Sequence, residues 1–247
     1  MKKLLYIFAL ILLASCNGNN VPDCFKNSGD IMTKEFAVTP FTKITVFENV
    51  EMVITEAPDF KVTVSTGEYL MDNVEVKVEG NRLKLYDNNG CNLTRDYGLT
   101  KIYVEAPNVT EIRSSTGLTI SSNGVLNYPL LHLISEDDSG DFTRSGNFNI
   151  EVANTNISVT VNALSTSFIS GTTDKLTIFY ASGDSRFEGR NLIAQEVSIF
   201  HRGTNDITVN PQVKLTANLV STGNVISVNT PADLDIQEQY IGRVIFE

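Results

Sequence analysis

The chain has no tryptophan and only two histidines and three cysteines among its 247 residues. Without tryptophan, it lacks the largest aromatic side chain with which a surface can stack on a ligand. The cysteines and the distant His132 and His201 do not supply the four clustered ligands of a zinc site. No serine lies in a G-x-S-x-G elbow. The sequence therefore predicts no metal site, no cofactor, no catalytic residue and no enzymatic activity.

Basic residues are also scarce. The chain has 19 Lys and Arg against 29 Asp and Glu, a net charge of −10, and no basic run beyond Lys2-Lys3. Such a chain repels the phosphates of nucleic acids and anionic lipid surfaces. We therefore expect no nucleic-acid partner.

Long apolar runs are absent except near the start, where Lys2-Lys3 precede the ten apolar residues Leu4–Leu13. This length is typical of a signal peptide and is too short to span a bilayer as a helix. The following Leu13-Ala14-Ser15-Cys16 resembles a bacterial lipobox, which implies cleavage after residue 15 and lipidation of Cys16. The alternative is an ordinary secretory signal with a chance cysteine. The lipobox predicts a chain anchored through Cys16 in the outer membrane, on its periplasmic face or at the cell surface.

Without Lys2 and Lys3, the mature chain has 17 basic and 29 acidic residues, a net charge of −12. Residues 16–35 are polar and contain Asn, Gly and Pro, so they are predicted to form a flexible tether. A single all-β domain is expected over residues 36–247. Cys24 and Cys91 would meet oxidising conditions after export. A disulfide between them would pin the tether to the domain, but spacing alone does not establish their proximity.

Strand patterns begin near residue 41. Apolar and polar residues alternate, and Val74, Val76 and Val78 are followed by Gly80-Asn81 and then by Leu83 and Leu85. This pattern predicts N-terminal β-hairpins, most clearly the one that turns at Gly80. The segment GEYLMDN (67–73) is expected to form one short helical turn, and no longer helix is predicted.

Beyond residue 100, a regular period appears in two series. The first is the glycines 117, 140, 183, 203, 223 and 242, with steps of 23, 43, 20, 20 and 19. The second is apolar-x-apolar triplets centred at 132, 151, 177, 198, 216 and 235, whose long step of 26 suggests an insertion near 163–174. The period predicts a β-solenoid with about 20 residues per coil, in which triplets face inward and glycines form corners. A β-sandwich remains an alternative, whereas propeller and leucine-rich repeats fit less well.

The order of these parts resembles a known family. A lipobox is followed by FTKITVFENVEMVITEAPDFKVTVSTGEYLMDNVEVKVEGNRLKLY, then KIYVEAPNVTEIRSSTGLTI, then serial glycine corners. Over residues 36–247, this is similar to the adhesin-type "head GIN" domain family of lipoproteins from Bacteroides-like bacteria. The resemblance implies a right-handed solenoid-like all-β body and no assigned catalytic residues. The Ser-Gly-Asp corners typical of that family are altered here to Ser-Thr-Gly, Asp-Ser-Gly-Asp and Arg-Gly-Thr.

One acidic turn is a weak calcium candidate. Its carboxylates are Glu136, Asp137, Asp138 and Asp141, and calcium takes six to eight oxygen ligands. The spacing is not that of an EF-hand loop, and a solvated corner is the simpler interpretation. Asp141 and Asp184 occupy equivalent corners and would be the carboxylates of a solenoid glycan hydrolase, but solubilising corner residues explain them as well.

The expected outer surfaces are rich in Asn, Thr and Ser, which can hydrogen-bond polar ligands including carbohydrate, whereas Phe187 and Phe200 are expected in the core. The resulting hypothesis is a lipid-anchored, non-enzymatic, adhesin-like module that binds a glycan or protein. The alternatives are a structural subunit of an envelope assembly and, less favoured, a polysaccharide-active enzyme. The first acid after Cys16 is Asp23, which weakens the surface-exposed variant. The apolar C-terminal YIGRVIFE predicts a packed cap or self-association at the solenoid end.

Overall fold

The computed structural model describes residues 23–93, 95–136 and 145–247, and this part of the chain is all-β. Its helical segments are two single 3-10 turns, η1 (Asp23–Phe25) and η2 (Met71–Asn73). The second confirms the short turn expected in residues 67–73. Among the described residues, no helix is long and apolar enough to cross a membrane.

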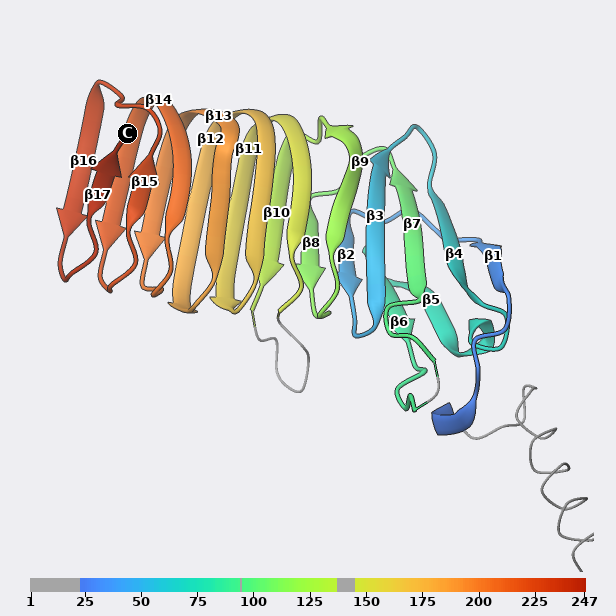
Figure 1. The fold of residues 1–247 in the computed structure, drawn as a ribbon. Helices are drawn as coiled ribbons and strands as arrows, with labels where there is room; N and C mark the ends of the chain where they lie inside the picture. Colours follow the sequence, from blue (N-terminus) through green and yellow to red (C-terminus); the bar gives the residue numbers. More distant parts are fainter. Residues whose placement is uncertain (1–22, 94, 137–144) are drawn as a thin grey trace, which may run out of the picture.

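Seventeen strands are linked in one hydrogen-bonded sheet, which is arranged as two rows with the apolar core between them (Figure 1). Row A contains, in spatial order, β5 (Val74–Glu79), β6 (Arg82–Asp87), β2 (Lys43–Val46), β8 (Glu111–Ser114), β10 (Leu130–Ser135), the second parts of β11 to β14, and β16 (Asp233–Glu238).

Row B lies opposite and contains the other strands. In spatial order these are β1 (Ile31–Phe36), β4 (Lys61–Gly67), β7 (Thr100–Ala106), β3 (Val50–Glu56), β9 (Ile120–Leu126), the first parts of β11 (Phe148–Ala163), β12 (Thr166–Gly183), β13 (Arg186–His201) and β14 (Ile207–Leu219), then β15 (Val225–Ser227) and β17 (Val244–Phe246). The four long strands therefore contribute to both rows.

In the C-terminal half, the strands pair in parallel with strands that come earlier and later in the chain. One inward position of row A is filled in turn by Leu131, Ile157, Leu176, Val197, Leu215 and Leu234. The residue numbers of these successive partners differ by 26, 19, 21, 18 and 19. The extra residues thus lie between β10 and β11, and the insertion expected near 163–174 is wrong. The reason is that the triplet Ile150–Val152 belongs to row B, and a period of two does not tell which row a triplet occupies.

The N-terminal half is wound differently from the expectation. The hairpin of β5 and β6 at Gly80 is confirmed. The other predicted hairpins are wrong, because β2 lies between β6 and β8 and β3 lies between β7 and β9, all in parallel. Residues 43–56 are therefore inserted between two segments that come later in the chain. Alternation indicates which face of a strand is buried, but it says nothing about the strand's partner or direction.

The predicted tether (16–35) is too long. Ile31–Phe36 form β1, an edge strand antiparallel to β4. Its side chains are almost all exposed, so the sequence has no alternation of apolar residues there that would predict a strand. The structure contains a disulfide between Cys24 and Cys91, with Cα atoms 4.5 Å apart. It ties the residues before β1 to the loop after β6.

Stacked glycines form the corners of the C-terminal half. The amide of Gly223 donates to the carbonyl of Gly203 at 3.2 Å, and the amide of Gly242 donates to that of Ser221 at 2.9 Å. Among the described corner glycines, only Gly183 has a positive φ, 93°. At Gly223 the requirement is instead space, because a Cβ there would lie 2.3 Å from the Asn205 carbonyl oxygen.

His201 closes one of these corners from within. Its side chain is fully buried, its Nδ1 accepts from the Gly203 amide at 3.3 Å, and its Nε2 lies 2.8 Å from the Asn205 carbonyl oxygen. The carbonyl can only accept, so Nε2 carries the proton and the ring is neutral. Burial lowers the pKa of His201, and burial likewise lowers that of the half-buried His132.

We expect Gly223→Ala to destabilise the protein by about 1–3 kcal/mol, because the added methyl group must displace backbone of the neighbouring corner. Gly90→Ala is the matched control, since a Cβ there meets nothing within 4 Å. Urea unfolding of both variants measures the difference. Equal midpoints for the two variants would contradict the close-approach explanation.

We also expect the free energy of unfolding to fall as the pH drops below about 6.5. The pKa of His201 is lower in the folded than in the unfolded chain, so the unfolded chain takes up the proton first. The loss starts at the unfolded pKa and ends below the folded one. Urea unfolding at pH 7.5 and 5.5 should show this loss in the wild type. It should be smaller in His201→Gln and nearly absent when His132→Gln is added. An unchanged loss in the double variant would refute the assignment.

Candidate functional site

The outer face of row A carries side chains in ordered lines. Because the parallel strands are paired in register, outward residues of neighbouring strands stand side by side across the sheet. From β12 to β16 three such lanes run next to one another. The charged lane is Lys175, Glu196, Lys214 and Asp233; the hydroxyl lane is Thr177, Ser198 and Thr216, ending at Asp235; the aromatic lane is Phe179 and Phe200, followed by Asn218 and Gln237.

The hydroxyl lane and the aromatic lane together line a groove, which we name the trench. It has a volume of about 360 Å³ and crosses β12, β13, β14 and β16. In one wall, the rings of Phe179 and Phe200 stack at 4.9 Å with an interplanar angle of 17°. Phe179 is 44% exposed, although it lies on a regular strand of the sheet. The trench therefore offers an aromatic surface beside a row of hydroxyl groups.

Charges in the lane beside the trench are balanced. Lys175 pairs with Glu196 at 3.8 Å, and Lys214 pairs with Asp233 at 2.9 Å. Of the residues that line the trench, Asp235 alone carries a carboxylate. Glycoside hydrolysis takes two carboxylates that flank the bond, and this lining supplies one. The arrangement is suited to holding a polar ligand by stacking and hydrogen bonds.

A second groove, which we name the basic groove, lies at the other end of row A. It has a volume of about 320 Å³ and is lined by Thr45, Phe47, Arg82, Lys84, Tyr86, Arg113 and Ser115. The rings of Phe47 and Tyr86 stack at 4.0 Å and 12°. The Nζ atom of Lys77 lies 5.4 Å from the centre of the Tyr86 ring. Strands β2, β6 and β8, which are distant in sequence, each contribute to this groove.

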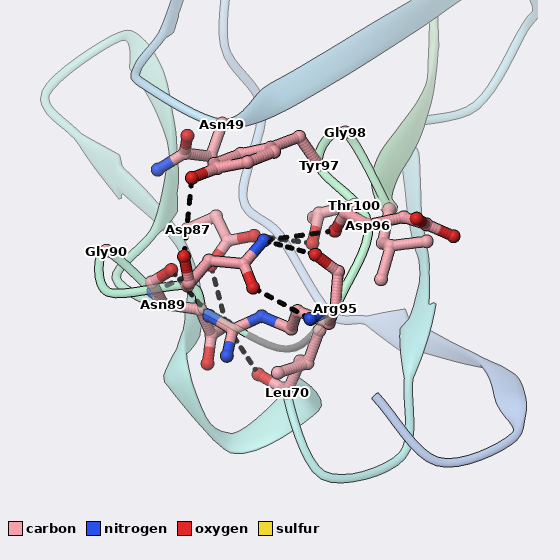
Figure 2. A pocket seen from close by; sticks show the side chains of 12 residues that line it. Asn49, Leu70, Asp87, Asn89, Gly90, Arg95, Asp96, Tyr97, Gly98 and Thr100 are labelled. Atoms are coloured by element: carbon pink, nitrogen blue, oxygen red, sulfur yellow. Dashed lines mark hydrogen bonds between the residues drawn. The ribbon is translucent and has the colours of Figure 1, made fainter. Parts of the chain in front are cut away.

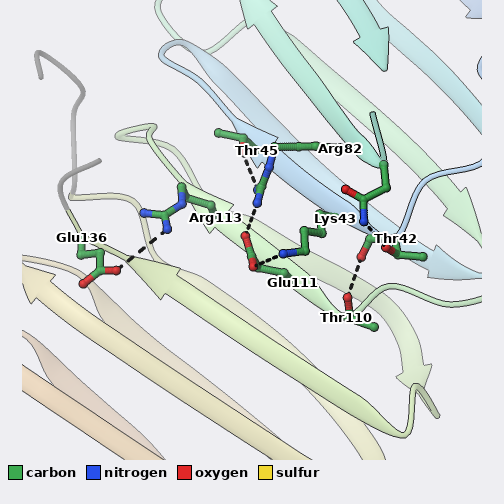
Figure 3. A network of polar contacts seen from close by, with 9 residues as sticks. Thr42, Lys43, Thr45, Arg82, Thr110, Glu111, Arg113 and Glu136 are labelled. Atoms are coloured by element: carbon green, nitrogen blue, oxygen red, sulfur yellow. Dashed lines mark hydrogen bonds and ion pairs between the residues drawn. The ribbon is translucent and has the colours of Figure 1, made fainter. Parts of the chain in front are cut away.

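A half-buried carboxylate, that of Glu111, holds one cation of the basic groove, Arg82, in place (Figure 3). Arg82 donates to Thr45 Oγ1 at 3.0 Å and to Glu111 Oε1 at 2.5 Å, and Lys43 Nζ lies 3.2 Å from Glu111 Oε2. Burial alone would raise the pKa of Glu111, but its hydrogen bonds with Arg82 and Lys43 lower that pKa overall. Glu111 therefore stays ionised and fixes the Arg82 guanidinium.

A third, small cavity of about 30 Å³ is lined by Asp87, Asn89, Tyr97 and Thr100 among other residues (Figure 2). The Asp87 carboxylate there accepts from the Asn89 amide at 2.8 Å and from the Thr100 hydroxyl at 2.5 Å. Thr100 in turn lies 2.8 Å from Thr66 Oγ1. These contacts connect the loop after β6 to row B, and the space holds about one water molecule. We assign this network a structural role.

Three of the four carboxylates of the calcium candidate, Asp137, Asp138 and Asp141, lie outside the described residues. The lipidation candidate Cys16 also lies outside them. Glu136 is described, and its carboxylate lies 3.9 Å from Arg113 (Figure 3). Within the described ranges, no group of three His, Cys, Asp or Glu side chains could hold a metal ion. Asp184 accepts from Thr204 Oγ1 at 2.8 Å at a corner. His132 faces outward from row A, and its Nε2 lies 2.8 Å from Thr160 Oγ1.

The hydroxyl lane was anticipated from composition, but the aromatic side of the face was not. Phe187 is buried as expected. Phe200 was expected in the core, and this is wrong, because it is half-buried in the trench wall. The signal was present: Val197 and Ile199 face inward, so the alternation places Phe200 outward.

Comparison with curated protein sequences finds no match. Among solved structures, a putative adhesin from Bacteroides fragilis has a TM-score of 0.78 at 17% identity, over 90% of this chain and 99% of its own. A putative adhesin from Parabacteroides merdae has a TM-score of 0.62 at 14% identity, over 90% and 98% of the two chains.

A third structure, described as a putative lipid binding protein from Parabacteroides distasonis, has a TM-score of 0.59 at 17% identity, over 89% of this chain and 98% of its own. These likenesses concern the fold. A family model matches residues 40–231, which is most of the chain. The chain therefore belongs to the family described as putative auto-transporter adhesin, head GIN domain.

Proposed function

We propose that this protein is a non-enzymatic, adhesin-like module that binds a linear polysaccharide along the trench. The observation that carries the proposal is the trench itself, in which hydroxyl groups and stacked rings repeat from strand to strand. A polymer laid across β12 and β13 meets a hydroxyl group and a phenyl ring on each of these two strands, at a spacing of about 4.8 Å. Balanced charges in the neighbouring lane favour a neutral polymer over a strongly charged one.

We infer further that residues 111–247 wind as a right-handed β-solenoid with about 20 residues per coil. The parallel registers support this, because paired positions in successive strands mostly recur at that period along the chain. Stacked corner glycines at the same spacing support it as well. The right hand follows from the family resemblance.

Lipid anchoring at Cys16 is part of the same proposal. The signal-like start and the lipobox-like residues support it, and attachment to the outer membrane would hold the β-body near the envelope. The tether would be short, since the Cys24–Cys91 disulfide ties the chain to the body only eight residues after Cys16. Such a short connection would keep the N-terminal end of the body close to the membrane.

A second candidate function is a structural subunit of an envelope assembly. It is favoured by the C-terminal end, where β16 and β17 are edge strands among the described residues. Leu234 continues an inward position of the core and is still 42% exposed, while Ile241 is 61% exposed. Uncovered strand edges with apolar side chains favour association with another chain or copy.

To test the trench, we would measure binding of laminarin, xylan and mannan by affinity electrophoresis and calorimetry. At least one of them should bind, and Phe179→Ser with Phe200→Ser should weaken that binding about tenfold, because two stacking rings are lost. Phe168→Ser is the matched control, since Phe168 is 46% exposed on row B. Equal losses in both variants, or release of new reducing ends, would contradict the proposal.

To separate the two candidate functions, intact cells would be treated with a large protease, with lysed cells as the control. The binding module should be digested on intact cells and should incorporate a palmitate label, and Cys16→Ser should abolish the label. Protection until lysis, together with cross-linking to envelope proteins or to itself, would favour the assembly subunit instead. Absence of the label in the wild type would refute the lipid anchor.

A further inference from the structure

We propose that the trench selects a polysaccharide whose sugars carry an acetamido group, and that Asn218 and Gln237 bind that group beside the Phe200 ring. This selectivity deepens the proposed function of the trench, on which it rests, by naming the class of sugar. It arises from three features of the trench: the order of side chains along the aromatic lane, the orientation of the Phe200 ring, and the hydrogen bond that holds the Asn218 side chain.

The aromatic lane changes character halfway along the trench. Phe179 on β12 and Phe200 on β13 are followed in register by Asn218 on β14 and Gln237 on β16. All four side chains line the groove. Successive positions are about 4.8 Å apart, so the lane offers two rings and then two carboxamides at a regular spacing. A ligand that lies along the lane meets a stacking surface at one end and amide hydrogen-bonding groups at the other.

The Phe200 ring has one face against Phe179 and the other toward the amides. The two ring centres are 4.9 Å apart and the rings are inclined by 17°. This distance is close to the strand spacing of about 4.8 Å, so both rings direct their faces toward neighbouring strands. Phe179 is the one ring in contact with Phe200 within the described ranges. On the β14 side the neighbour is Asn218, a shorter side chain, and the groove runs over both residues.

A planar group above Asn218 would continue the ring stack. This position is one strand spacing from Phe200, about 4.8 Å, and Phe200 stacks on Phe179 at nearly the same distance. An acetamido group is planar and ends in a methyl group, so one of its faces can pack against the Phe200 ring. A hydroxyl group at the same place on a sugar has no flat face and makes no such contact.

A hydrogen bond orients the Asn218 side chain toward this position. Its Oδ1 accepts from Gln239 Nε2 at 2.8 Å, and Gln239 is not among the residues that line the trench. Asn218 Nδ2 has no partner among the described residues, so it can donate to the carbonyl of an acetamido group. Gln237 lies next to Asn218 in the lane, and its side-chain oxygen can accept from the acetamido N–H. Because Gln239 holds Asn218, little conformational freedom is lost on binding.

Asp235 is the feature that would favour a different sugar. It carries the carboxylate in the trench lining and would attract the cation of an amino sugar. Lys214 lies nearby and pairs with Asp233 at 2.9 Å. The pKa of Lys214 is raised by its hydrogen bond with Asp233 and also by the charge of Asp235. The positive charge of Lys214 therefore offsets part of the attraction, and a neutral acetamido group suits the trench better than an amine.

The test is calorimetry on the mature chain with three tetrasaccharides of the same linkage. Chitotetraose carries acetamido groups, cellotetraose carries hydroxyl groups at the same positions, and the glucosamine tetramer carries amino groups there. Chitotetraose should bind about tenfold or more tightly than cellotetraose, because its acetamido group alone stacks on Phe200 and pairs with Asn218 and Gln237. In about 500 mM sodium chloride, which screens exposed charges, the glucosamine tetramer should bind no more tightly than cellotetraose.

Two matched variants locate the acetamido group. Asn218→Asp keeps an oxygen that accepts from Gln239 and removes the donating nitrogen, so it should weaken chitotetraose binding about tenfold. It should leave cellotetraose binding within about twofold. Asn156→Asp is the control, because Asn156 is half-buried on row A beside Lys175 and outside the trench; it should leave both affinities unchanged. Thermal unfolding checks the fold of each variant, and if Asn218→Asp does not fold, the ratio of the two affinities in the wild type decides.

The proposal is overturned by equal binding of chitotetraose and cellotetraose, by equal losses in Asn218→Asp and Asn156→Asp, or by binding of the glucosamine tetramer as tight as that of chitotetraose at high salt. Chitotetraose binding that is unchanged by Phe179→Ser with Phe200→Ser would place the ligand outside the trench and would also overturn it.

Failure of the trench itself gives a different pattern. If the phenylalanine variant weakens binding of laminarin, xylan or mannan but chitotetraose is not preferred, the trench remains a binding site and the acetamido selectivity is wrong. If none of these polymers binds and chitotetraose does not bind at millimolar concentration, the proposed function and the selectivity are both wrong. Chitotetraose binding that depends on both Phe200 and Asn218 supports the two together.

Discussion

In-register parallel pairing is the constraint on which the rest of this structure depends. Strands β12 and β13 each satisfy their backbone groups on two neighbours, one earlier and one later in the chain. Since the side chains of paired strands superpose, an inward position must stay apolar through every repeat, as at Leu176, Val197 and Leu215. The same superposition compels corners to stack, which is why glycine recurs where a Cβ would meet the backbone of the preceding corner. Outward positions neither pack in the core nor stack at corners, so the residue types at these positions can vary.

Much of this arrangement could be predicted from the sequence, because period and alternation are local signals. The all-β class, the hairpin at Gly80 and the inward triplets of row A were predictable in this way. The position of the triplet Ile150–Val152 in row B could not be predicted, because strands of both rows show the same alternation of apolar and polar residues. Strand β1 escaped prediction because an exposed edge strand needs no apolar face. The insertion of β2 and β3 between later segments depends on which strands pair with each other, and no local sequence pattern specifies this.

The two grooves differ in predictability for the same reason. The trench is built from successive strands, so its hydroxyl lane could be anticipated, and correct alternation would also have placed Phe200 outward. The basic groove brings together Phe47, Tyr86 and Ser115 from three separate segments. Their meeting depends on the insertion of β2, so no spacing in the sequence could indicate it. The two grooves therefore present linings of different composition on one face of the sheet.

The inserted strands also bear on the order in which the chain acquires its structure. In the C-terminal half, the paired positions of successive long strands are only 17 to 21 residues apart in the chain, so these strands can be added one after another. Residues 43–56, in contrast, need partners from both 82–106 and 111–126. Their loop-closure entropy is lost before any of these contacts form. Strands β2 and β3 must therefore wait for strands that follow them in the chain, and this end of the body is completed only after β6 to β9 are in place.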